Sequence, residues 1–270
     1  MHLNNDFVFS ANNLQDYVDC PRRFELKYLL NQSWPAVVSH PVQKMEEKMS
    51  MGTEFHRLAR QYLEGLPTET LVASAKYQQV VEWFDRFTRF SAPYVKSRHF
   101  TEYASFTSLD GYRLVAVFDF IAFFDDGQII IADWKTTEAQ PRRDYYQNRI
   151  QTLLYPLVAF ETAPYLFEKS RNYSPSDISF LYWFPAFPEK SLEFPFSAEI
   201  EQNNRLMISN LIHEISIKAP GDYCKTEETR HCEFCRYRSL CERGTEAGSV
   251  EGETDLDIDD LIGSLSLDLP

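Results

Sequence analysis

The sequence predicts an α/β protein, a central β-sheet flanked by helices, on three observations. Up to about residue 98, apolar residues recur at helical spacing. Residues 99–137 are instead rich in β-branched and aromatic residues, and two Asp-Gly steps at 110–111 and 126–127 divide them as in a three-stranded antiparallel meander. Helical spacing returns after this stretch, with one further short strand expected at 177–185.

Start and stop signals place the helices. Ser10 is the expected N-cap of the first helix, and Pro21 interrupts or restarts that helix. The remaining helices are expected at 49–66, 77–90, 142–160 and 203–216.

Length and composition allow one substantial core, since 44% of the 270 residues are hydrophobic. No apolar run reaches the roughly 18 residues of a membrane span, and the first residues lack the basic and apolar regions of a signal peptide. We therefore expect a cytoplasmic protein without membrane contact. In that compartment the five cysteines serve as metal ligands or free thiols rather than disulfides.

Charge is unevenly distributed along the chain. The net charge is −13, but residues 246–270 hold eight acids and no Lys or Arg, so the rest carries −5 and can still form a local basic groove. We expect one domain, with a helical segment at about 10–98, a core at about 99–220 and a cysteine cluster at 224–241, together spanning 1–243. Residues 244–270 are expected to be a disordered acidic tail, either solubilising or able to fold on a partner.

The segment "IIIADWK" ends a dry strand in charged residues. Asp133 and Lys135 lie two positions apart, hence on one face of a strand. The turn before this strand decides what Asp133 faces. A two-residue loop pairs Asp133 with Phe120, whereas a three-residue loop with glycine in the left-handed position sets Asp133 opposite Asp119.

The three-residue alternative builds a site. Asp119, Asp133 and Lys135 would then project from one face of the sheet, and two facing carboxylates raise each other's pKa unless a cation lies between them. All-oxygen ligation suits Mg²⁺ or Mn²⁺. For an isolated D-x-K tripeptide the alternative is an ordinary surface ion pair.

Five segments in order, "GTEFH", Glu102, "FDFI", "DWKTT" and "QTLLY", give the tripeptide its context. Together they resemble the PD-(D/E)XK nuclease superfamily, specifically its RecB-like branch. The resemblance spans about residues 8–243. It implies a restriction-endonuclease-like core with a mixed central sheet, preceded by an N-terminal helical segment.

The resemblance also implies roles for the matching residues. The metal ligands would be His56, Asp119, Asp133 and the backbone carbonyl of Trp134. Lys135 would orient or activate the attacking water. Many relatives carry Gly three residues before the strand Asp, where this chain has Ala116, which indicates different backbone packing near the scissile phosphate.

Two helical positions complete the implied catalytic set. Gln151 and Tyr155 are four apart, so they share one helical face, and they fall where the family supports the lysine and contacts DNA. Glu102 has a weaker role in the family, so we do not include it in the primary catalytic set. Each of these residues alone would read as ordinary helix or strand surface.

The cysteines form a second motif. "HCEFCRYRSLC" spaces Cys232, Cys235 and Cys241 as C-x2-C-x5-C, and thiolates in such a cluster bind zinc or iron-sulfur. The fourth ligand is either Cys224, giving a local zinc site, or Cys20, giving a long-range clasp. Spacing alone slightly favours the local zinc site.

The resemblance favours the clasp instead. AddB-type and CRISPR-associated RecB-like nucleases carry an early "CP" cysteine and a late C-x2-C-x5-C run that together hold a 4Fe-4S cluster. "CPRRF" matches the first of these, which implies a cluster on Cys20, Cys232, Cys235 and Cys241 and leaves Cys224 as a spare thiol. By analogy with a disulfide, such a clasp would contribute on the order of 5 kcal/mol.

These motifs predict a Mg²⁺- or Mn²⁺-dependent deoxyribonuclease, with single-stranded DNA ends as substrate and a role as an exonuclease in DNA repair, recombination or CRISPR adaptation. Basic and aromatic side chains could line a groove for the strand, or could be solvated surface; they are Arg22, Arg23, Arg142, Arg143, Arg149, Arg236, Arg238, Tyr145, Tyr146 and Tyr155. RecB-like modules often work beside helicases and this chain has no Walker A loop, so the resemblance implies a helicase or other repair protein as partner, bound through the acidic tail. The alternative is a non-cutting DNA-binding or scaffold subunit of a helicase-nuclease assembly.

Overall fold

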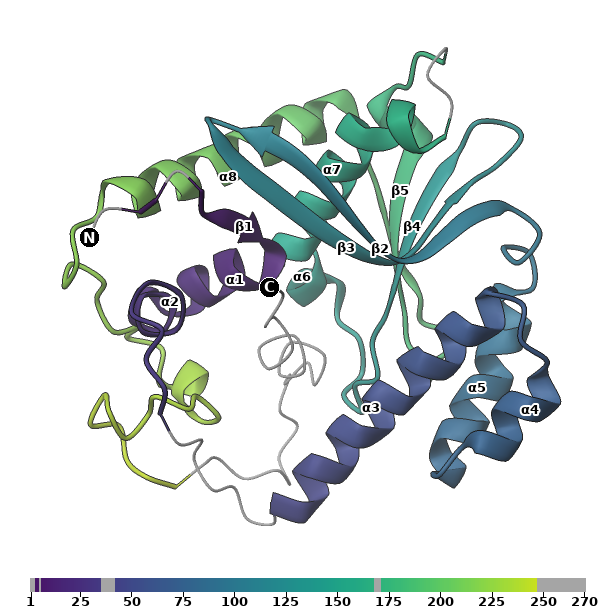
Figure 1. Ribbon diagram of the computed structural model, residues 1–270, viewed down its shortest axis with the longest axis horizontal. Coiled ribbons are helices and arrows are strands. Elements are labelled where there is room, and N and C mark those ends of the chain that lie inside the picture. Colours follow the sequence, from purple (N-terminus) through teal and green to yellow (C-terminus); the bar gives the residue numbers. More distant parts are fainter. Residues whose placement is uncertain (1–2, 5, 35–41, 168–170, 247–270) are drawn as a thin grey trace.

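A mixed six-stranded sheet lies between two layers of helices in the computed structural model (Figure 1). The structure describes residues 3–4, 6–34, 42–167 and 171–246. The α/β prediction with a mixed, restriction-endonuclease-like sheet is therefore confirmed. Most of the predicted acidic tail lies outside the described residues.

The described strands are β1 (Val8–Ser10), β2 (Arg98–Leu109), β3 (Tyr112–Phe123), β4 (Ile129–Trp134), β5 (Ile178–Trp183) and β6 (Leu192–Pro195). Pairing follows the order β1-β3-β4-β5-β6, and β2 also pairs with β3. The β1–β3 and β4–β5 pairs are parallel and the others antiparallel. The predicted meander and the strand near 177–185 are confirmed, whereas β1 and β6 are too short to show a pattern in the sequence.

The described α-helices are α1 (Ala11–Asp19), α2 (Pro21–Phe24), α3 (Val42–Leu63), α4 (Thr68–Ser74), α5 (Gln78–Ser91), α6 (Arg143–Tyr146), α7 (Ile150–Leu166) and α8 (Ala198–Ile217). A π-helical turn, Glu25–Leu29, continues α2. Ser10 caps α1 and Pro21 begins α2, as predicted. The helix expected at 142–160 is instead two helices, α6 and α7, and α4 was not predicted. No described helix is long and apolar enough to cross a membrane.

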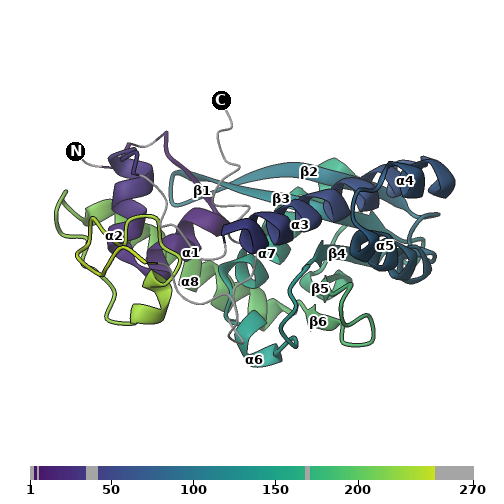
Figure 2. The ribbon, with the colours of Figure 1, turned by 90° about the horizontal axis from the view of Figure 1, so that it is seen from below.

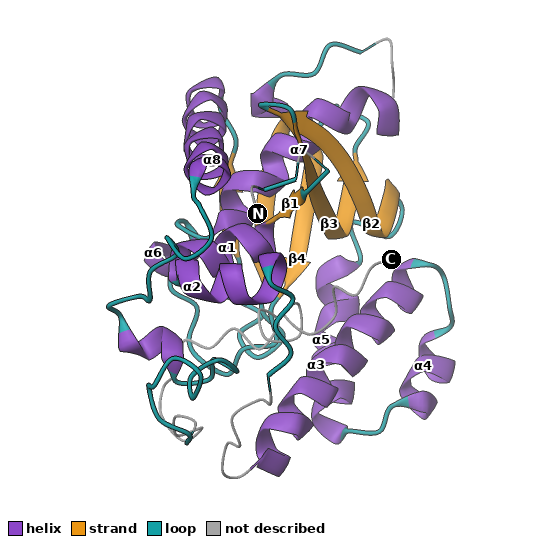
Figure 3. Ribbon diagram, turned by 60° about the vertical axis from the view of Figure 1, so that its left-hand side comes forward, coloured by secondary structure: helices purple, strands orange, loops and turns teal. Residues whose placement is uncertain are grey.

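The two faces of the sheet have separate cores. On one face, α7 packs centrally with α1 and α8 beside it, around Phe9, Ile131 and Phe180. On the other face, α3 and α5 bury an aromatic cluster that includes Phe55, Phe87 and Trp183. Figure 3 shows α3, α4 and α5 grouped together, apart from α1, α2 and α8.

The turn between β3 and β4 is the three-residue one. The Phe124 amide donates to the Gln128 carbonyl at 2.9 Å, and Gly127 between them has φ of +93°, a conformation that costs glycine little. Phe120 consequently pairs with Ala132 rather than with Asp133. Continuing this register by one residue sets Asp119 opposite Asp133.

The sheet's alternation of sides breaks at Glu102, which has a left-handed φ of +46° in the middle of β2. Phe100 and Tyr103, three residues apart, both pack on the α7 side with their rings 5.0 Å apart. Across on β3, Phe118 packs on the α7 side but Phe120 on the α3 side, although residues two apart normally share a face. Asp119 lies at this break, between the two layers.

Candidate active site

Three acids occupy one row across neighbouring strands. The β2–β3 register pairs Thr101 with Phe120 and Tyr103 with Phe118, so Glu102 lies opposite Asp119, which in turn lies opposite Asp133. The row falls in a gap of the sheet. Along one edge of β3, β1 pairs with residues 113–115 and β4 with residues 120–123, and the backbone between them pairs only with β2.

Asp119 is reached from two directions. Its Oδ2 accepts a hydrogen bond from the Trp134 amide at 3.1 Å and lies 3.2 Å from Nδ1 of His56 on α3. The side chains of His56 and Asp119 are each 20% exposed. His56 and Asp119, two of the metal ligands that the resemblance implies, therefore lie side by side. The predicted metal ligand at Trp134 is its carbonyl, and that role stays a prediction.

Asp133 and Lys135 form a buried ion pair. Nζ of Lys135 lies 2.9 Å from Oδ1 of Asp133, and the two residues are 5% and 4% exposed. The surface-pair alternative is therefore wrong. Removing one member of a buried pair leaves an uncompensated charge and typically costs about 3–5 kcal/mol.

The other oxygen of Asp133 is held by α7. The Gln151 amide donates to Oδ2 of Asp133, and the Tyr182 hydroxyl donates to Oε1 of Gln151 at 3.3 Å. Tyr182 of β5 is the register partner of Asp133. Gln151 thus fixes the carboxylate that pairs with Lys135.

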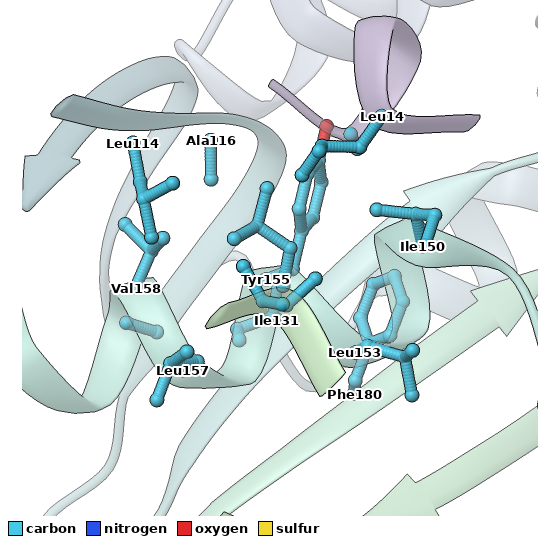
Figure 4. Packing of buried hydrophobic residues seen from close by; sticks show 14 of the residues in the cluster. Leu14, Leu114, Ala116, Ile131, Ile150, Leu153, Tyr155, Leu157, Val158 and Phe180 are labelled. Atoms are coloured by element: carbon cyan, nitrogen blue, oxygen red, sulfur yellow. The ribbon is translucent and has the colours of Figure 1, made fainter. Parts of the chain in front are cut away.

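Tyr155, the second predicted residue of the α7 face, is buried in the core (Figure 4). Its ring packs against Phe118 at 5.3 Å and Phe180 at 5.7 Å. Burial, followed by the charges of Asp133 and Asp119, raises the pKa of its phenol, so Tyr155 is a neutral group below the site. Its ring is not a surface for stacking DNA. Ala116, in place of the family's glycine, is buried in the same core.

Glu102 belongs more closely to the site than the sequence indicated. Its side chain is 42% exposed, and Nη1 of Arg60 on α3 lies 3.9 Å from its Oε2. Partial burial, and then the charge of Asp119, raise the pKa of its carboxyl. A left-handed non-glycine residue inside a strand is strained, and such strain concentrates at functional sites. Only the strand register reveals this neighbourhood, because Glu102 alone has no distinctive spacing.

A buried carboxylate holds the histidine helix in place. Glu54 of α3 accepts hydrogen bonds from the backbone amides of Lys76 and Tyr77, just before α5 begins. The side chain of Tyr77, the N-cap residue, makes no capping bond. Glu54 therefore caps α5 from a neighbouring helix and fixes α3, which carries His56 two residues later.

Four of the five cysteines line one cavity: Cys20, Cys232, Cys235 and Cys241. Cys224 is exposed and does not line it. Burial raises the pKa of the Cys235 thiol to about 11, against the opposing effect of the Arg23 guanidinium, and burial also raises the pKa of Cys241. The segment after α8 that carries the late cysteines lies beside α1 and α2 in both views (Figures 1 and 2).

In the described part of the chain, no group of three or more His, Cys, Asp or Glu side chains is arranged to hold a metal ion. The donor types nevertheless suit the predicted groups. Asp119, Asp133 and His56 offer hard oxygen and imidazole atoms, and four thiols face a shared cavity. Occupancy of either position stays a prediction.

The predicted basic and aromatic residues are dispersed. Arg23 is tied to Asp16 and Asp19, and Arg238 donates to backbone carbonyls of its own loop. Tyr146 is 4% exposed, whereas Tyr145 is half-buried. Arg149 lies over the ring of Tyr145, and Arg142 lines the same pocket as Tyr145. The Arg143 guanidinium instead donates to the Glu193 carbonyl and lies over the ring of Phe194.

Two of three comparisons with known proteins found a match. The crystal structure of SSO0001 is similar over 89% of this chain and 88% of its own, with 13% sequence identity and a TM-score of 0.38. A search of curated proteins gave no significant match. The sequence profile of the PD-(D/E)XK nuclease superfamily, however, matches residues 8–242, which includes the acidic row, Lys135, Gln151 and all five cysteines. The chain therefore belongs to the PD-(D/E)XK nuclease superfamily.

Proposed function

We propose that this protein is a metal-dependent deoxyribonuclease that degrades DNA from single-stranded ends. Membership of the superfamily implies a nuclease that binds DNA and, as these enzymes generally do, uses a divalent metal. One observation carries the proposal to this chain: Asp119 and Asp133 face each other in the gap of the sheet, with Lys135 paired to Asp133.

The metal ligands in this proposal are Asp119, Asp133, His56 and the carbonyl of Trp134, with Glu102 next to them in the row. A bound Mg²⁺ or Mn²⁺ supplies charge neutralisation for the phosphate and a lowered pKa for a coordinated water. The contact between His56 and Asp119 supports this set, because it brings an α3 side chain to the strand carboxylate.

The remaining residues orient the reacting groups. Lys135 presents an ammonium beside Asp133, where it can hold the attacking water or a phosphate oxygen. Its own amide donates to the Trp183 carbonyl at 2.9 Å, so the backbone below it is fixed. Gln151 keeps the second oxygen of Asp133 in place, which leaves that carboxylate one orientation.

The finer parts of the proposal are supported by the RecB-like motif order. They comprise exonuclease action on single strands, a role in DNA repair, recombination or CRISPR adaptation, and a helicase or other repair protein as partner. We further assign a 4Fe-4S cluster to Cys20, Cys232, Cys235 and Cys241, with zinc as the alternative. Their shared cavity supports this assignment over a set containing Cys224.

The test is degradation of end-labelled single-stranded DNA by anaerobically purified protein with Mg²⁺ or Mn²⁺. Wild type is compared with Asp119→Asn and Lys135→Ala. Asp119 is the safer position because its side chain is 20% exposed, whereas loss of Lys135 leaves Asp133 buried without its cation. Circular dichroism and iron content verify that each variant is folded and loaded.

Cutting by wild type that both variants lose would support the nuclease and locate its centre. Absence of cutting by folded, cluster-loaded wild type would favour the non-cutting DNA-binding or scaffold subunit. Cutting that survives in Asp119→Asn would place the chemistry elsewhere.

A further inference from the structure

The segment between β4 and α7, residues 135–149, contacts the candidate active site near both of its ends. Lys135 begins the segment, Gln151 is the second residue of α7, and both of these side chains contact the carboxylate of Asp133. The segment is therefore anchored at both ends to one proposed catalytic group.

This segment contains a pocket. Its lining residues are Thr137, Ala139, Gln140, Pro141, Arg142, Tyr145 and Tyr146. Thr137, at one end, is buried two residues after Lys135. Tyr146, at the other end, packs its ring 4.7 Å from that of Tyr182, whose hydroxyl donates to Gln151. The pocket's inner wall is thus linked by direct contacts to the group that orients Asp133.

The walls combine aromatic rings with cations. The half-buried ring of Tyr145 meets the buried ring of Tyr146 edge to face, with centroids 5.0 Å apart. The Arg149 guanidinium lies 5.4 Å from the Tyr145 centroid. Arg142, 57% exposed, pairs at the rim with Asp144 at 2.8 Å.

Aromatic rings beside guanidinium groups are the combination that binds single-stranded nucleic acid, because bases stack on the rings and phosphates pair with the cations. A base inside a duplex is already stacked and paired, so it offers no free face to Tyr145. The exposed polar atoms of Gln140 and Arg142 can meet base edges without demanding one sequence.

We propose that the ring of Tyr145 at the edge of this small pocket, with Arg142 in the pocket lining and Arg149 beside the ring, is a stacking subsite for an unpaired nucleobase next to the phosphate at the acidic row. The proposal rests on the proposed nuclease function and adds a reason for a single-strand preference. The subsite selects strands whose bases are already unstacked, and it positions the neighbouring phosphate at Asp119 and Asp133.

The test is binding in the presence of EDTA, which removes the divalent metal and hence the predicted cutting. Fluorescence anisotropy measures the Kd of the full chain for a labelled oligothymidine and for a blunt duplex. The variants are Tyr145→Ala and Tyr145→Phe. Tyr165→Ala is the matched control, because Tyr165 is 77% exposed and lies at the far end of α7.

We expect Tyr145→Ala to weaken single-strand binding by about 5- to 150-fold, the range for loss of one stacked base, with duplex binding unchanged. Tyr145→Phe keeps the ring and should bind as wild type does, as should Tyr165→Ala. In a strand containing 2-aminopurine, binding should quench the fluorescence with wild type and Tyr145→Phe but not with Tyr145→Ala.

Equal Kd values for wild type and Tyr145→Ala would overturn the subsite, and so would equal losses on single strand and duplex. Failure of the two proposals is distinguishable. A stacking effect of Tyr145 in a protein that never cuts would sustain the subsite and refute the nuclease. DNA cutting by a protein in which Tyr145→Ala changes neither Kd would sustain the nuclease and refute the subsite.

Discussion

The carboxylate of Asp133 has a donor on each oxygen, Lys135 on one side and Gln151 on the other. Two donors leave little rotational freedom, which is how a site keeps a reacting group in one geometry. Gln151 is itself held by Tyr182. The resemblance implies that Gln151 supports Lys135; in the structure Gln151 contacts Asp133, the ion-pair partner of Lys135.

Replacing Gln151 by Ala should lower kcat about 10- to 100-fold, the usual effect of losing a partner that orients a metal-site ligand. The fold should persist, because the ion pair of Asp133 with Lys135 remains. Steady-state degradation of single-stranded DNA measures this effect. Gln147→Ala, exposed in the same segment, is the matched control; comparable losses in both variants would count against an orienting role.

Glu102 combines a left-handed φ of +46° with a place beside Asp119. At this position Glu102→Gly should be more stable than Glu102→Ala by about 1 kcal/mol, since only glycine adopts that backbone without strain. The usual order in a strand is the reverse. Urea unfolding of both variants measures the difference.

Ser108, an exposed residue of the same strand, provides the reference pair. Ser108→Ala should be the more stable member there. If Glu102 shows the same order as Ser108, its backbone is not strained.

At the scale of elements, Glu54 links α3 to the start of α5 by accepting the amides that precede α5. Glu54→Ala should destabilise the protein by about 1–3 kcal/mol, because it leaves the partly buried amides of Lys76 and Tyr77 without this acceptor. Glu82→Ala, an exposed change on α5, should fall within about 0.5 kcal/mol of wild type. Urea unfolding compares the two; equal effects would mean that Glu54 does not cap α5.

The first two helices are joined by a buried charge network around Asp16. Burial alone would raise the pKa of this carboxyl, but Arg23, Lys27 and the Tyr28 hydroxyl outweigh it and hold the pKa below 3.8. Their atoms lie at 2.8, 3.1 and 2.8 Å from the carboxylate. A carboxyl with a lowered folded-state pKa stabilises the protein above its unfolded value and loses this contribution as pH falls through the folded one.

Asp16→Asn should therefore cost about 3 kcal/mol at pH 7, and the difference from wild type should shrink below about pH 4. Chemical unfolding across this pH range measures it. Asp85→Asn, whose side chain is 62% exposed, should show no such convergence. A constant difference for Asp16→Asn would contradict the ionic origin.

At the scale of the whole molecule, the cysteine cavity joins residues 20–34 to the segment after α8. The Arg22 amide donates to the Cys224 carbonyl at 3.0 Å, and the Trp34 indole donates to Ser239 at 2.8 Å. These contacts hold the two segments together without any bound group. A cluster on the four cavity thiols would add a second, stronger closure.

Cys20→Ser should abolish brown colour and iron content and lower the thermal midpoint, because it removes the only ligand from the N-terminal side. Cys224→Ser should change none of these. Visible absorption with iron, sulfide and zinc analysis measures both variants. Zinc in a colourless wild type would replace the iron-sulfur assignment. Loss of iron in Cys224→Ser would instead make Cys224 the fourth ligand beside Cys232, Cys235 and Cys241.

Much of the fold could be predicted because its patterns are local. The Asp-Gly steps located both hairpins, Ser10 and Pro21 located the first two helices, and the apolar run of "IIIADW" located the central strand. The three-residue strand β1 and the four-residue β6 are fixed by pairing with distant strands, so the sequence around them has no period to read.

The site, too, could be predicted where its signals are local and not where it depends on pairing between strands. The motif order singled out His56, Asp119, Lys135 and Gln151, which the structure brings close to one another around the facing carboxylates. It could not choose between two hairpin registers, because both turns are permitted sterically. It also treated the strand faces as strictly alternating. The backbone at Glu102 breaks that alternation, and no residue type in the neighbourhood signals it.

This break has a mechanical consequence. Because Asp119 lies where the strand changes sides, it touches a helix on one face of the sheet, while its row neighbour Asp133 touches a helix on the other. Each helical layer therefore holds one of the two adjacent carboxylates. Any sliding of one layer against the other would change the distance between the Asp119 and Asp133 carboxylates, so the geometry of the candidate site depends on how the two layers are packed.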